Sequence, residues 1–518
     1  MPSRRAPLIF RTPALTLLRV LLFAFALPCV YLGAASAAYY YHRRAAATGL
    51  DSSRFSVLPS PQSTTRLMVF APHCDDETLG CAGLMQQTLA AGGRVQVGML
   101  TNGDAFRAAV ECQTHKLRIE ADDYIRFAAL RQEESCRALG ALGVTRENIH
   151  FFGYPDRGLM PIWIEHWSPE QAYYSTFTRC DRSPYTNTYL PNTVYCGENV
   201  VNDIKESLRA FRPNLITVTH PAEDHPDHAA AAAFVMRALL DLQADPREAA
   251  WAKKTRLRYY LVHRGDWPAA SLSTANAALL PPEEMVHTDT HWSILPLTAD
   301  QTACKSGSVA LYPSQTAMMG SFMNGFARRT ELYGEIPPVT LRTVPDATMK
   351  VDADTREWRQ LTPVLIDPVR DDVLRQMQGG GDISALYACR DSNTLYVRLD
   401  CRQPLSRSIV YTLHLRAFGE NGMSAPEATV IALHTGETGP MTSIGSHHKI
   451  ETGVVSASEG RTLEIAIPLA RLSRLLPEAS IPSLAVPSLA IRSLAISAET
   501  SLSGVEIDKT GVRFLQFP

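Results

Sequence analysis

The stretch Arg66-Leu-Met-Val-Phe-Ala-Pro-His-Cys-Asp-Asp-Glu-Thr78 decides the fold class, because a short apolar run leads directly into a polar motif and a helix-forming segment. Residues 66–70 predict a buried strand, and residues 78–91 predict a helix. The polar motif, His73-Cys-Asp-Asp-Glu77, therefore lies on the loop that leaves a strand. In open α/β sheets, ligands bind at this position, outside the carboxyl ends of the strands.

A second unit of the same kind follows far downstream. Residues 215–219 are a β-branched run that predicts a strand, and residues 229–242 are a strong helix-forming run. Between them lies His225-Pro-Asp-His228. Its two histidines are three residues apart, so they would share one face of the helix.

Together the two motifs supply the groups that a zinc hydrolase needs. A catalytic zinc takes about three nitrogen or oxygen ligands and keeps one position for water, whose pKa it lowers toward about 7. We predict that His73, Asp76 and His228 bind the metal. Asp75 would take the proton of the water and return it to the leaving group. Two histidines and one carboxylate suit iron as well as zinc.

The remaining polar residues of the second unit receive supporting roles. We predict that His225 stabilises the oxyanion and that Asp227 or Asp224 orients an imidazole. His220 and His263 each end a predicted strand and could line the pocket, although ordinary packing is the preferred interpretation.

At these residues the chain resembles the PIG-L/LmbE zinc-dependent N-acetyl-sugar deacetylases, whose motifs are His-Pro-Asp-Asp-Glu and, much later, His-Pro-Asp-His. The resemblance covers about residues 64–335 and departs at Cys74, where proline is commonest. It implies the same metal ligands, Asp75 as the general base and His225 as the oxyanion-stabilising group. It also implies a substrate that contains N-acetylglucosamine.

Further matches to this family lie outside the two motifs. Gly153-Tyr-Pro-Asp156 ends in an aspartate that resembles a substrate-contacting position, and Arg131 begins an Arg-Gln-Glu-Glu run on a predicted helix. We assign both Asp156 and Arg131 to substrate binding, with loop or helix salt bridges as the alternative. The same two interpretations apply to Asp104. Residues 305–315, with Arg328 and Glu331 after them, resemble the closing segment of the family.

Strands and helices alternate through this part of the chain. The predicted strands are residues 94–101, 149–153 and 257–263 beside those given above, and a further helix is predicted around residues 127–142. Such alternation predicts a Rossmann-like, mostly parallel sheet with covering helices, in a domain over residues 60–336. Residues 155–199 interrupt it as an insertion rich in Tyr, Asn, Pro and Trp, whose rings could stack on sugars or pack as a surface loop.

After Pro337-Pro338 the pattern changes to short strands of alternating polarity. The predicted strands are residues 383–389, 394–400, 409–416, 429–433 and 462–467. They predict an all-β sandwich over residues 345–518, which resembles family-nine-type carbohydrate-binding sandwiches. Trp358 could be a sugar platform, although an early tryptophan in such folds is more often part of the core.

The first fifty residues predict a membrane anchor. Residues 20–41 are apolar and long enough for a bilayer-spanning helix of roughly 20 residues. Arginines 4, 5, 11 and 19 precede or enter this stretch, so the positive-inside rule puts the rest of the chain outside the cytoplasm. Ala35-Ser-Ala37 resembles a signal-peptidase site. We expect an uncleaved anchor, with a secreted enzyme as the alternative.

Composition and charge constrain the number of domains and the kinds of partner, but they do not indicate a function. A chain of 518 residues exceeds the size of a single core, and a net charge of -2 gives no sign of a nucleic-acid partner. Export would permit disulfides, and the candidate pairs are Cys180 with Cys196, Cys389 with Cys401, and Cys112 with Cys136, against free thiols. Cys74 and Cys81 flank the first motif and are interpreted as packing residues rather than thiolate ligands.

The sequence therefore predicts a membrane-tethered, extracytoplasmic zinc N-deacetylase that acts on a glycan or glycoconjugate. One alternative keeps the metal and changes the substrate, to an acylated small molecule or a thiol conjugate. Another, from a different class, is a glycan-binding surface protein whose metal site is vestigial.

Overall fold

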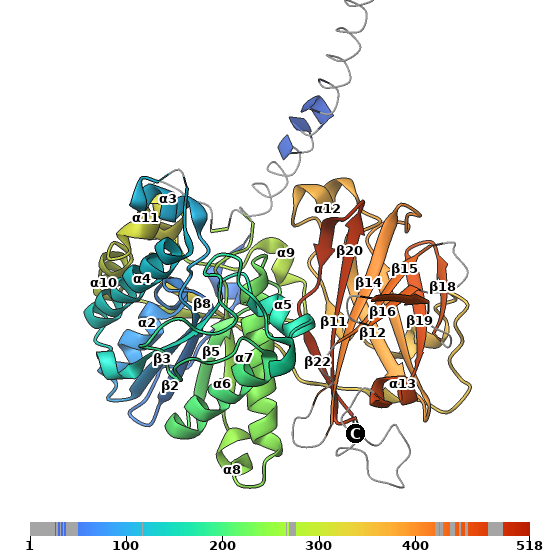
Figure 1. The fold of residues 1–518 in the computed structure, drawn as a ribbon. Coiled ribbons are helices and arrows are strands. Elements are labelled where there is room, and N and C mark those ends of the chain that lie inside the picture. The colour runs from blue at the N-terminus through green and yellow to red at the C-terminus, as the bar shows by residue number, and fades with distance from the viewer. Residues whose placement is uncertain are drawn as a thin grey trace, which may run out of the picture.

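Two layered units, an α/β unit and a β-sandwich, lie side by side in the computed structural model (Figure 1). The structure describes residues 26, 29–31, 33, 34, 36, 37, 50–116, 118–265, 267, 268, 276–419, 424, 428–435, 441–444, 447–450, 454–474 and 491–517. The predicted membrane segment therefore lies largely outside the described residues. Within the described ranges, no helix combines the length and the apolar character that crossing a bilayer requires.

The α/β unit is built on one sheet. Its eight described strands are β1 (Ser56–Val57), β2 (Arg66–Ala71), β3 (Arg94–Thr101), β4 (Ile149–Tyr154), β5 (Leu215–Thr219), β6 (Arg256–Tyr260), β7 (His291–Pro296) and β8 (Thr330–Glu335). They lie in the order β1-β7-β8-β6-β5-β2-β3-β4. The five strands from β6 to β4 along this order run parallel, whereas β8 is antiparallel to both β6 and β7. The predicted mostly parallel sheet is confirmed. The antiparallel strand β8, which lies between β6 and β7, was not predicted.

Helices cover both faces of this sheet. Those with contacts on one face are α2 (Asp76–Ala90), α4 (Ala121–Ala141) and α10 (Ala299–Val309), and those on the other are α5 (Leu159–Ile164), α6 (Gly197–Phe211) and α7 (Pro226–Ala244). The remaining helices of the unit are η1 (Ser52–Arg54), α3 (Arg107–Thr114), η2 (Arg146–Asn148), η3 (Pro169–Gln171), α8 (Ala249–Ala252), α9 (Glu283–Val286) and α11 (Pro313–Asn324). Along β2, Leu67 and Val69 enter one apolar core and Met68 and Phe70 the other. Burial on both faces explains why the sequence of this strand is a continuous run of apolar residues.

The order of strands reverses between β2 and β5. From β2 the chain moves to β3 and β4 on one side, and from β5 to β6 on the other. Ligands bind at such a switch point in open α/β sheets. Both sequence motifs follow these two strands, so the topology brings them to one place.

The C-terminal part is a sandwich of two sheets. The described strands are β9 (Val339–Thr340), β10 (Arg342–Thr343), β11 (Leu365–Ile366), β12 (Ile383–Arg390), β13 (Thr394–Cys401), β14 (Ile409–Phe418), β15 (Thr429–His434), β16 (Met441–Ile444), β17 (His447–Ile450), β18 (Val455–Glu459), β19 (Thr462–Pro468), β20 (Ser493–Leu502), β21 (Val505–Lys509) and β22 (Arg513–Gln516), with the helices η4 (Glu357–Gln360), α12 (Val373–Met377) and α13 (Leu469–Arg474). One sheet runs β10-β12-β13-β19-β18 with β11 beside β12, and the other runs β17-β16-β15-β14-β20-β22-β9 with β21 beside β20. Apolar side chains of both sheets form a shared core. The five strands predicted from the sequence are confirmed.

Trp358 belongs to the interior of the sandwich. Its side chain is 2% exposed and packs with Met349, Cys389 and Tyr396. A ring in this position presents no face to a sugar, so the core interpretation of Trp358 holds and the sugar-platform interpretation is wrong.

The predicted disulfide bridges are not formed. All ten cysteines belong to the described residues and all are free thiols. The hairpin of β12 and β13 shows the reason for one pair: Cys389 lies opposite Tyr396, while Cys401 lies opposite Ile383 at the other end. Their side chains are therefore separated by the length of the hairpin.

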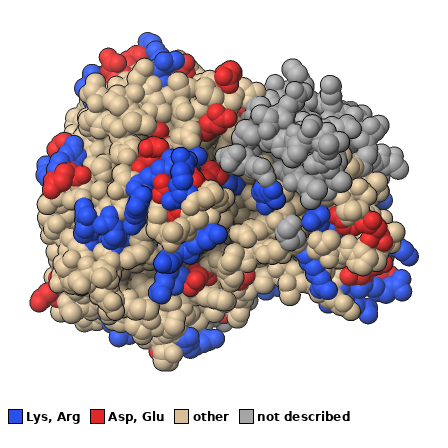
Figure 2. Space-filling view, turned by 90° about the horizontal axis from the view of Figure 1, so that it is seen from below, with Lys and Arg blue, Asp and Glu red and all other residues tan. Residues whose placement is uncertain are grey.

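The two units share an apolar interface. Phe418 and Phe514 of the sandwich join the same core cluster as Trp163 and Phe234 of the α/β unit, and the ring of Phe418 lies 6.2 Å from that of Trp163. Figure 1 shows α5, which carries Trp163, directly beside the sandwich. On the outer surface, Lys and Arg side chains lie among Asp and Glu side chains over the α/β unit (Figure 2).

Truncating Phe418 to alanine is expected to lower the free energy of unfolding by about 3–5 kcal/mol, as for other buried phenylalanines. The ring is fully buried at the interface, so its loss leaves a cavity between the units. Urea denaturation of the full chain measures the change. The matched control is Tyr174→Ala, whose side chain is 55% exposed, and an equal effect of both substitutions would contradict a shared core.

Candidate functional site

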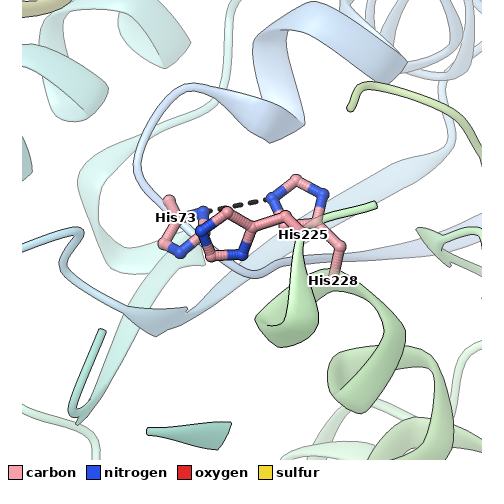
Figure 3. A group of neighbouring side chains, drawn as sticks. All are labelled: His73, His225 and His228. Atoms are coloured by element: carbon pink, nitrogen blue, oxygen red, sulfur yellow. Dashed lines mark hydrogen bonds between the residues drawn. The ribbon is translucent and has the colours of Figure 1, made fainter. Parts of the chain in front are cut away.

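The two motifs meet at the carboxyl ends of β2 and β5. His73 lies on the loop between β2 and α2, and His228 lies in the first turn of α7. His225 caps that helix, because its Nδ1 accepts a hydrogen bond from the backbone N–H of Asp227. Figure 3 shows the three histidine rings gathered in one place, with His73 joined to His228.

Three donor atoms form a nearly equilateral triangle. His73 Nδ1 lies 3.1 Å from His228 Nε2 and 3.3 Å from Asp76 Oδ2, and His228 Nε2 lies 3.2 Å from the same oxygen. Donors at about 2.0–2.2 Å from a tetrahedral ion would be separated by roughly 3.3–3.6 Å. The triangle therefore fits one small divalent cation.

The surroundings of the triangle fit the same use. Asp76 and His228 are fully buried and His73 is 7% exposed. Within the described part of the chain, Asp76 Oδ1 has no hydrogen-bond partner, although an unpaired buried carboxylate oxygen is costly. Some residues of the triangle also belong to other groups of side chains that lie close enough together to hold a metal ion. These groups add His225, His263 and Asp156.

Carboxylates lie behind both histidines of the triangle. His73 Nε2 is 3.2 Å from Asp156 Oδ1 and 3.4 Å from Asp227 Oδ2, while His228 Nδ1 is 3.6 Å from Glu223 Oε2. Such partners fix the orientation of metal-binding imidazoles. Asp227 therefore lies where its predicted role requires, whereas Asp224 does not contact either ring in this way and Glu223 was missed.

Asp75 has a strained backbone and faces the pocket. Its φ of 137° is rare for a residue other than glycine, and such strain persists where the surroundings enforce it, commonly at functional sites. Arg131 Nη2 donates to Asp75 Oδ2 at 3.1 Å and to the carbonyl of Cys74 at 2.6 Å. Burial raises the pKa of the Asp75 carboxyl well above its usual range, against the opposing charge of Arg131.

Arg131 is therefore placed to hold the motif loop. Its Nη1 also donates to the carbonyl of Gly103 at 2.9 Å, and the side chain is 4% exposed. Both terminal nitrogens of the guanidinium thus donate to other groups of the protein, although Arg131 still lines the pocket.

His225 presents a hydrogen-bond donor. Because its Nδ1 accepts from the backbone N–H of Asp227, the neutral ring carries its proton on Nε2. Burial, followed by the charges of His73 and His228, lowers the pKa of His225 to about 2. A neutral imidazole with a free N–H is the form that stabilises a developing oxyanion.

The predicted insertion closes one wall of the site. Tyr185 of this insertion donates to Asp104 Oδ2 at 2.6 Å, and Asp104 Oδ1 accepts from the backbone N–H of Asp156 at 3.1 Å. Burial and the neighbouring Asp156 raise the pKa of Asp104 to about 7. Asp104 thus supports Asp156 from behind and does not line the pocket.

The pocket over the triangle has a volume of about 170 Å³. Its lining residues are His73, Asp75, Phe106, Arg131, Asp156, Arg157, His225, His263, Gln315 and Met319. Pockets that enclose drug-sized ligands have about 300–1,000 Å³, so this one encloses only an end of a larger molecule. A larger cavity of about 370 Å³ lies between α7 and the sandwich. His220 lines it, but none of the residues predicted to bind metal or substrate or to act in catalysis does.

Four other candidates from the sequence are placed by the structure. His263 lines the pocket with its ring stacked on Phe322 at 5.3 Å, so the packing interpretation of His263 is incomplete. His220 instead stacks on Trp292 and bonds Thr290, away from the pocket. Cys74 and Cys81 are fully buried in an apolar core, and burial raises the pKa of both thiols, which disfavours thiolate ligands.

Fold and site together define a doubly wound α/β domain with a His–Asp–His cluster at its switch point. Residues 68–239 match the sequence profile of the PIG-L family, described as GlcNAc-PI de-N-acetylase. The chain thus contains a PIG-L family domain at these residues.

Individual relatives are more distant. The chain is 28% identical over 194 residues to 1D-myo-inositol 2-acetamido-2-deoxy-alpha-D-glucopyranoside deacetylase 1 of Catenulispora acidiphila, which is 36% of this chain and 51% of that protein. The match therefore spans about half the length of this curated relative.

Solved structures with a similar chain include a deacetylase triple mutant from the teicoplanin biosynthetic pathway, with 17% identity, a TM-score of 0.34 and coverage of 52% of this chain and 97% of that one. Another is the N,N'-diacetylchitobiose deacetylase of Pyrococcus horikoshii, with 16% identity, a TM-score of 0.30 and coverage of 50% and 74%.

Proposed function

We propose that this protein is a zinc-dependent N-deacetylase that removes the acetyl group from an N-acetylglucosamine unit of a glycan or glycoconjugate. The observation that carries the proposal is the triangle of His73, Asp76 and His228 donor atoms, with sides of 3.1–3.3 Å, below a pocket that also contains Asp75. The PIG-L family domain supports the choice of reaction.

The residues of the pocket divide the hydrolysis between them. A zinc ion held by the triangle would supply Lewis-acid chemistry and lower the pKa of water toward about 7. Asp75 takes a proton from the attacking water, and the Nε2–H of His225 donates to the carbonyl oxygen as it becomes negative. Asp75 then gives its proton to the amine nitrogen as the C–N bond breaks. The products are the free amine and acetate.

Two observations support N-acetylglucosamine as the substrate unit: the names of the relative and of the family, and the size of the pocket. The curated relative is named as a deacetylase of a 2-acetamido-2-deoxy-glucopyranoside, and the family description names GlcNAc-PI. The pocket of about 170 Å³ suits one N-acetyl group and part of its sugar, so the rest of the substrate would lie outside. We therefore propose a terminal or exposed N-acetylglucosamine unit.

The place of action is part of this proposal. We infer an enzyme that works outside the cytoplasm, held at the membrane or released from it, because residues 1–50 combine an amino-terminal basic cluster with a long apolar stretch.

Acetate release tests the proposal. We expect the full-length protein to release acetate from N-acetylglucosamine glycans, to lose this activity with a chelator and to regain it with added zinc. Acylated non-sugar amides and thiol conjugates serve as comparison substrates. Acetate release only from these comparison substrates would mean that the enzyme cleaves another class of amide. Glycan binding without any acetate release would contradict the proposed enzymatic activity.

A further inference from the structure

An ion pair crosses from the α/β unit to the sandwich directly beside the site. Arg264, which follows His263 in the chain, pairs with Asp371 of the sandwich. The side chain of Asp371 is fully buried and that of Arg264 is 4% exposed. A buried pair of this kind fixes geometry strongly, because removing one partner leaves a buried charge without compensation.

On the α/β side, Arg264 holds the loop that precedes α7. Its Nη1 donates to the carbonyl oxygen of Ala222 at 2.8 Å and to Asp224 Oδ1 at 3.0 Å. The backbone N–H of Asp224 in turn donates to the carbonyl of His263 at 2.9 Å. Arg264 thus fastens the loop to the end of the neighbouring strand.

That loop carries two groups of the site. Glu223 accepts from the backbone N–H groups of Val262 and His263 and lies behind His228. His225 follows Asp224 and caps α7. The position of the loop therefore sets both the orientation of the His228 ring and the direction of the His225 donor.

On the sandwich side, Asp371 is itself held. Arg375 Nη1 lies 2.7 Å from Asp371 Oδ2, and Arg375 Nε lies 2.8 Å from Asp508 Oδ1. Asp508 Oδ2 accepts from the backbone N–H of Ile383 at 2.7 Å. Asp371 is therefore part of a rigid network that reaches into strand β12.

A second contact reaches the other side of the site. Arg416 of β14 is 2% exposed and donates from Nη2 to the carbonyls of Trp163 at 2.7 Å and Ile164 at 3.0 Å. These are the last carbonyls of α5, where a cation is favourable. At the start of the same helix, the backbone N–H of Leu159 donates to Asp227 Oδ1 at 3.0 Å.

We propose that the sandwich is a positioning domain for the active site, and that Asp371, acting through Arg264, is a positioning residue for His225 and His228. This inference rests on the proposed function. It gives the sandwich a role in the geometry of the site that requires no sugar binding by the sandwich.

The test substitutes asparagine for Asp371 in the full-length protein. Zinc alone is titrated to give its Kd, and acetate release gives kcat and KM. We expect the zinc Kd to rise about tenfold and kcat to fall about tenfold, the lower end of the effect of residues that orient a ligand from behind. KM should stay within about twofold, because Asp371 does not line the pocket.

Asp400→Asn is the matched control. Asp400 forms an ion pair with Arg398 and a hydrogen bond with Thr462 inside the sandwich, at a side-chain exposure of 18%. We expect it to leave the zinc Kd and kcat unchanged. Asp371→Glu, which keeps the charge, should recover part of the loss.

Arg264→Lys gives a second route. A lysine can pair with Asp371 but cannot also reach Ala222 and Asp224 as a fork, so the same changes in zinc Kd and kcat are expected. This variant decides the question if Asp371→Asn does not fold. An unchanged zinc Kd and kcat in a folded variant overturns the inference. Absence of zinc binding in the unsubstituted protein would instead overturn the proposed function.

Discussion

Replacing Asp75 with asparagine is expected to lower kcat for acetate release by about 10²–10⁴-fold, the range that a positioned general acid and base contributes. Asparagine has the size of aspartate and can still accept from Arg131, but it cannot take a proton from water. Because the loss falls on the chemical step, KM and the zinc content should change little. Steady-state kinetics and metal analysis of the purified protein measure these quantities.

The control for this substitution is Asp203→Asn. Asp203 is a carboxylate of α6, 3% exposed, that accepts from the Tyr154 hydroxyl at 2.7 Å and lies outside the pocket. It should retain kcat, because this carboxylate lies outside the pocket and an asparagine at this position can still accept from the Tyr154 hydroxyl. A similar kcat in the Asp75→Asn protein would mean that another group moves the proton.

Removing the Asp76 carboxylate is expected to abolish both zinc binding and catalysis. Residues that only support a ligand cost about 10–100-fold in metal affinity, so the loss of a ligand should exceed 100-fold. The charge stabilisation by a metal is worth several kcal/mol, which corresponds to a loss of about 10³-fold or more in kcat/KM. Asp76→Ala tests both effects by zinc titration and kinetics.

Glu77→Gln separates the loss of a ligand from damage to the loop. Glu77 is equally buried, but its carboxylate bonds Tyr312 at 2.5 Å and the backbone N–H of Asp75 at 2.9 Å. It should retain zinc binding. Full zinc occupancy in the Asp76→Ala protein would contradict the assigned ligand set.

Much of the fold could be predicted because local patterns and tertiary burial agree. The strands β3 and β5 have the predicted bounds, since each is an apolar run buried on both faces. The antiparallel direction of β8 was not predicted. In β8, Glu331 lies inside a strand and is fully buried, because it accepts from the backbone N–H groups of Gly83 and Leu84 and pairs with Lys305. No local pattern indicates such partners.

The site divides in the same way. The convergence of His73, Asp76 and His228 could be predicted because their motifs follow two strands that flank the switch point. Glu223 could not, since its role depends on backbone donors from a strand end forty residues away. Its position at the carboxyl end of a strand was the available signal. The sequence around Asp371 gave no such signal, because only the docking of the two units brings this residue to Arg264.

Anomalous diffraction at the zinc edge, from crystals of the full-length protein grown with zinc, tests the central claim most directly. The account predicts one peak about 2.0–2.2 Å from His73 Nδ1, Asp76 Oδ2 and His228 Nε2. A peak bound by other residues, or no peak at this triangle with zinc in excess, would contradict it.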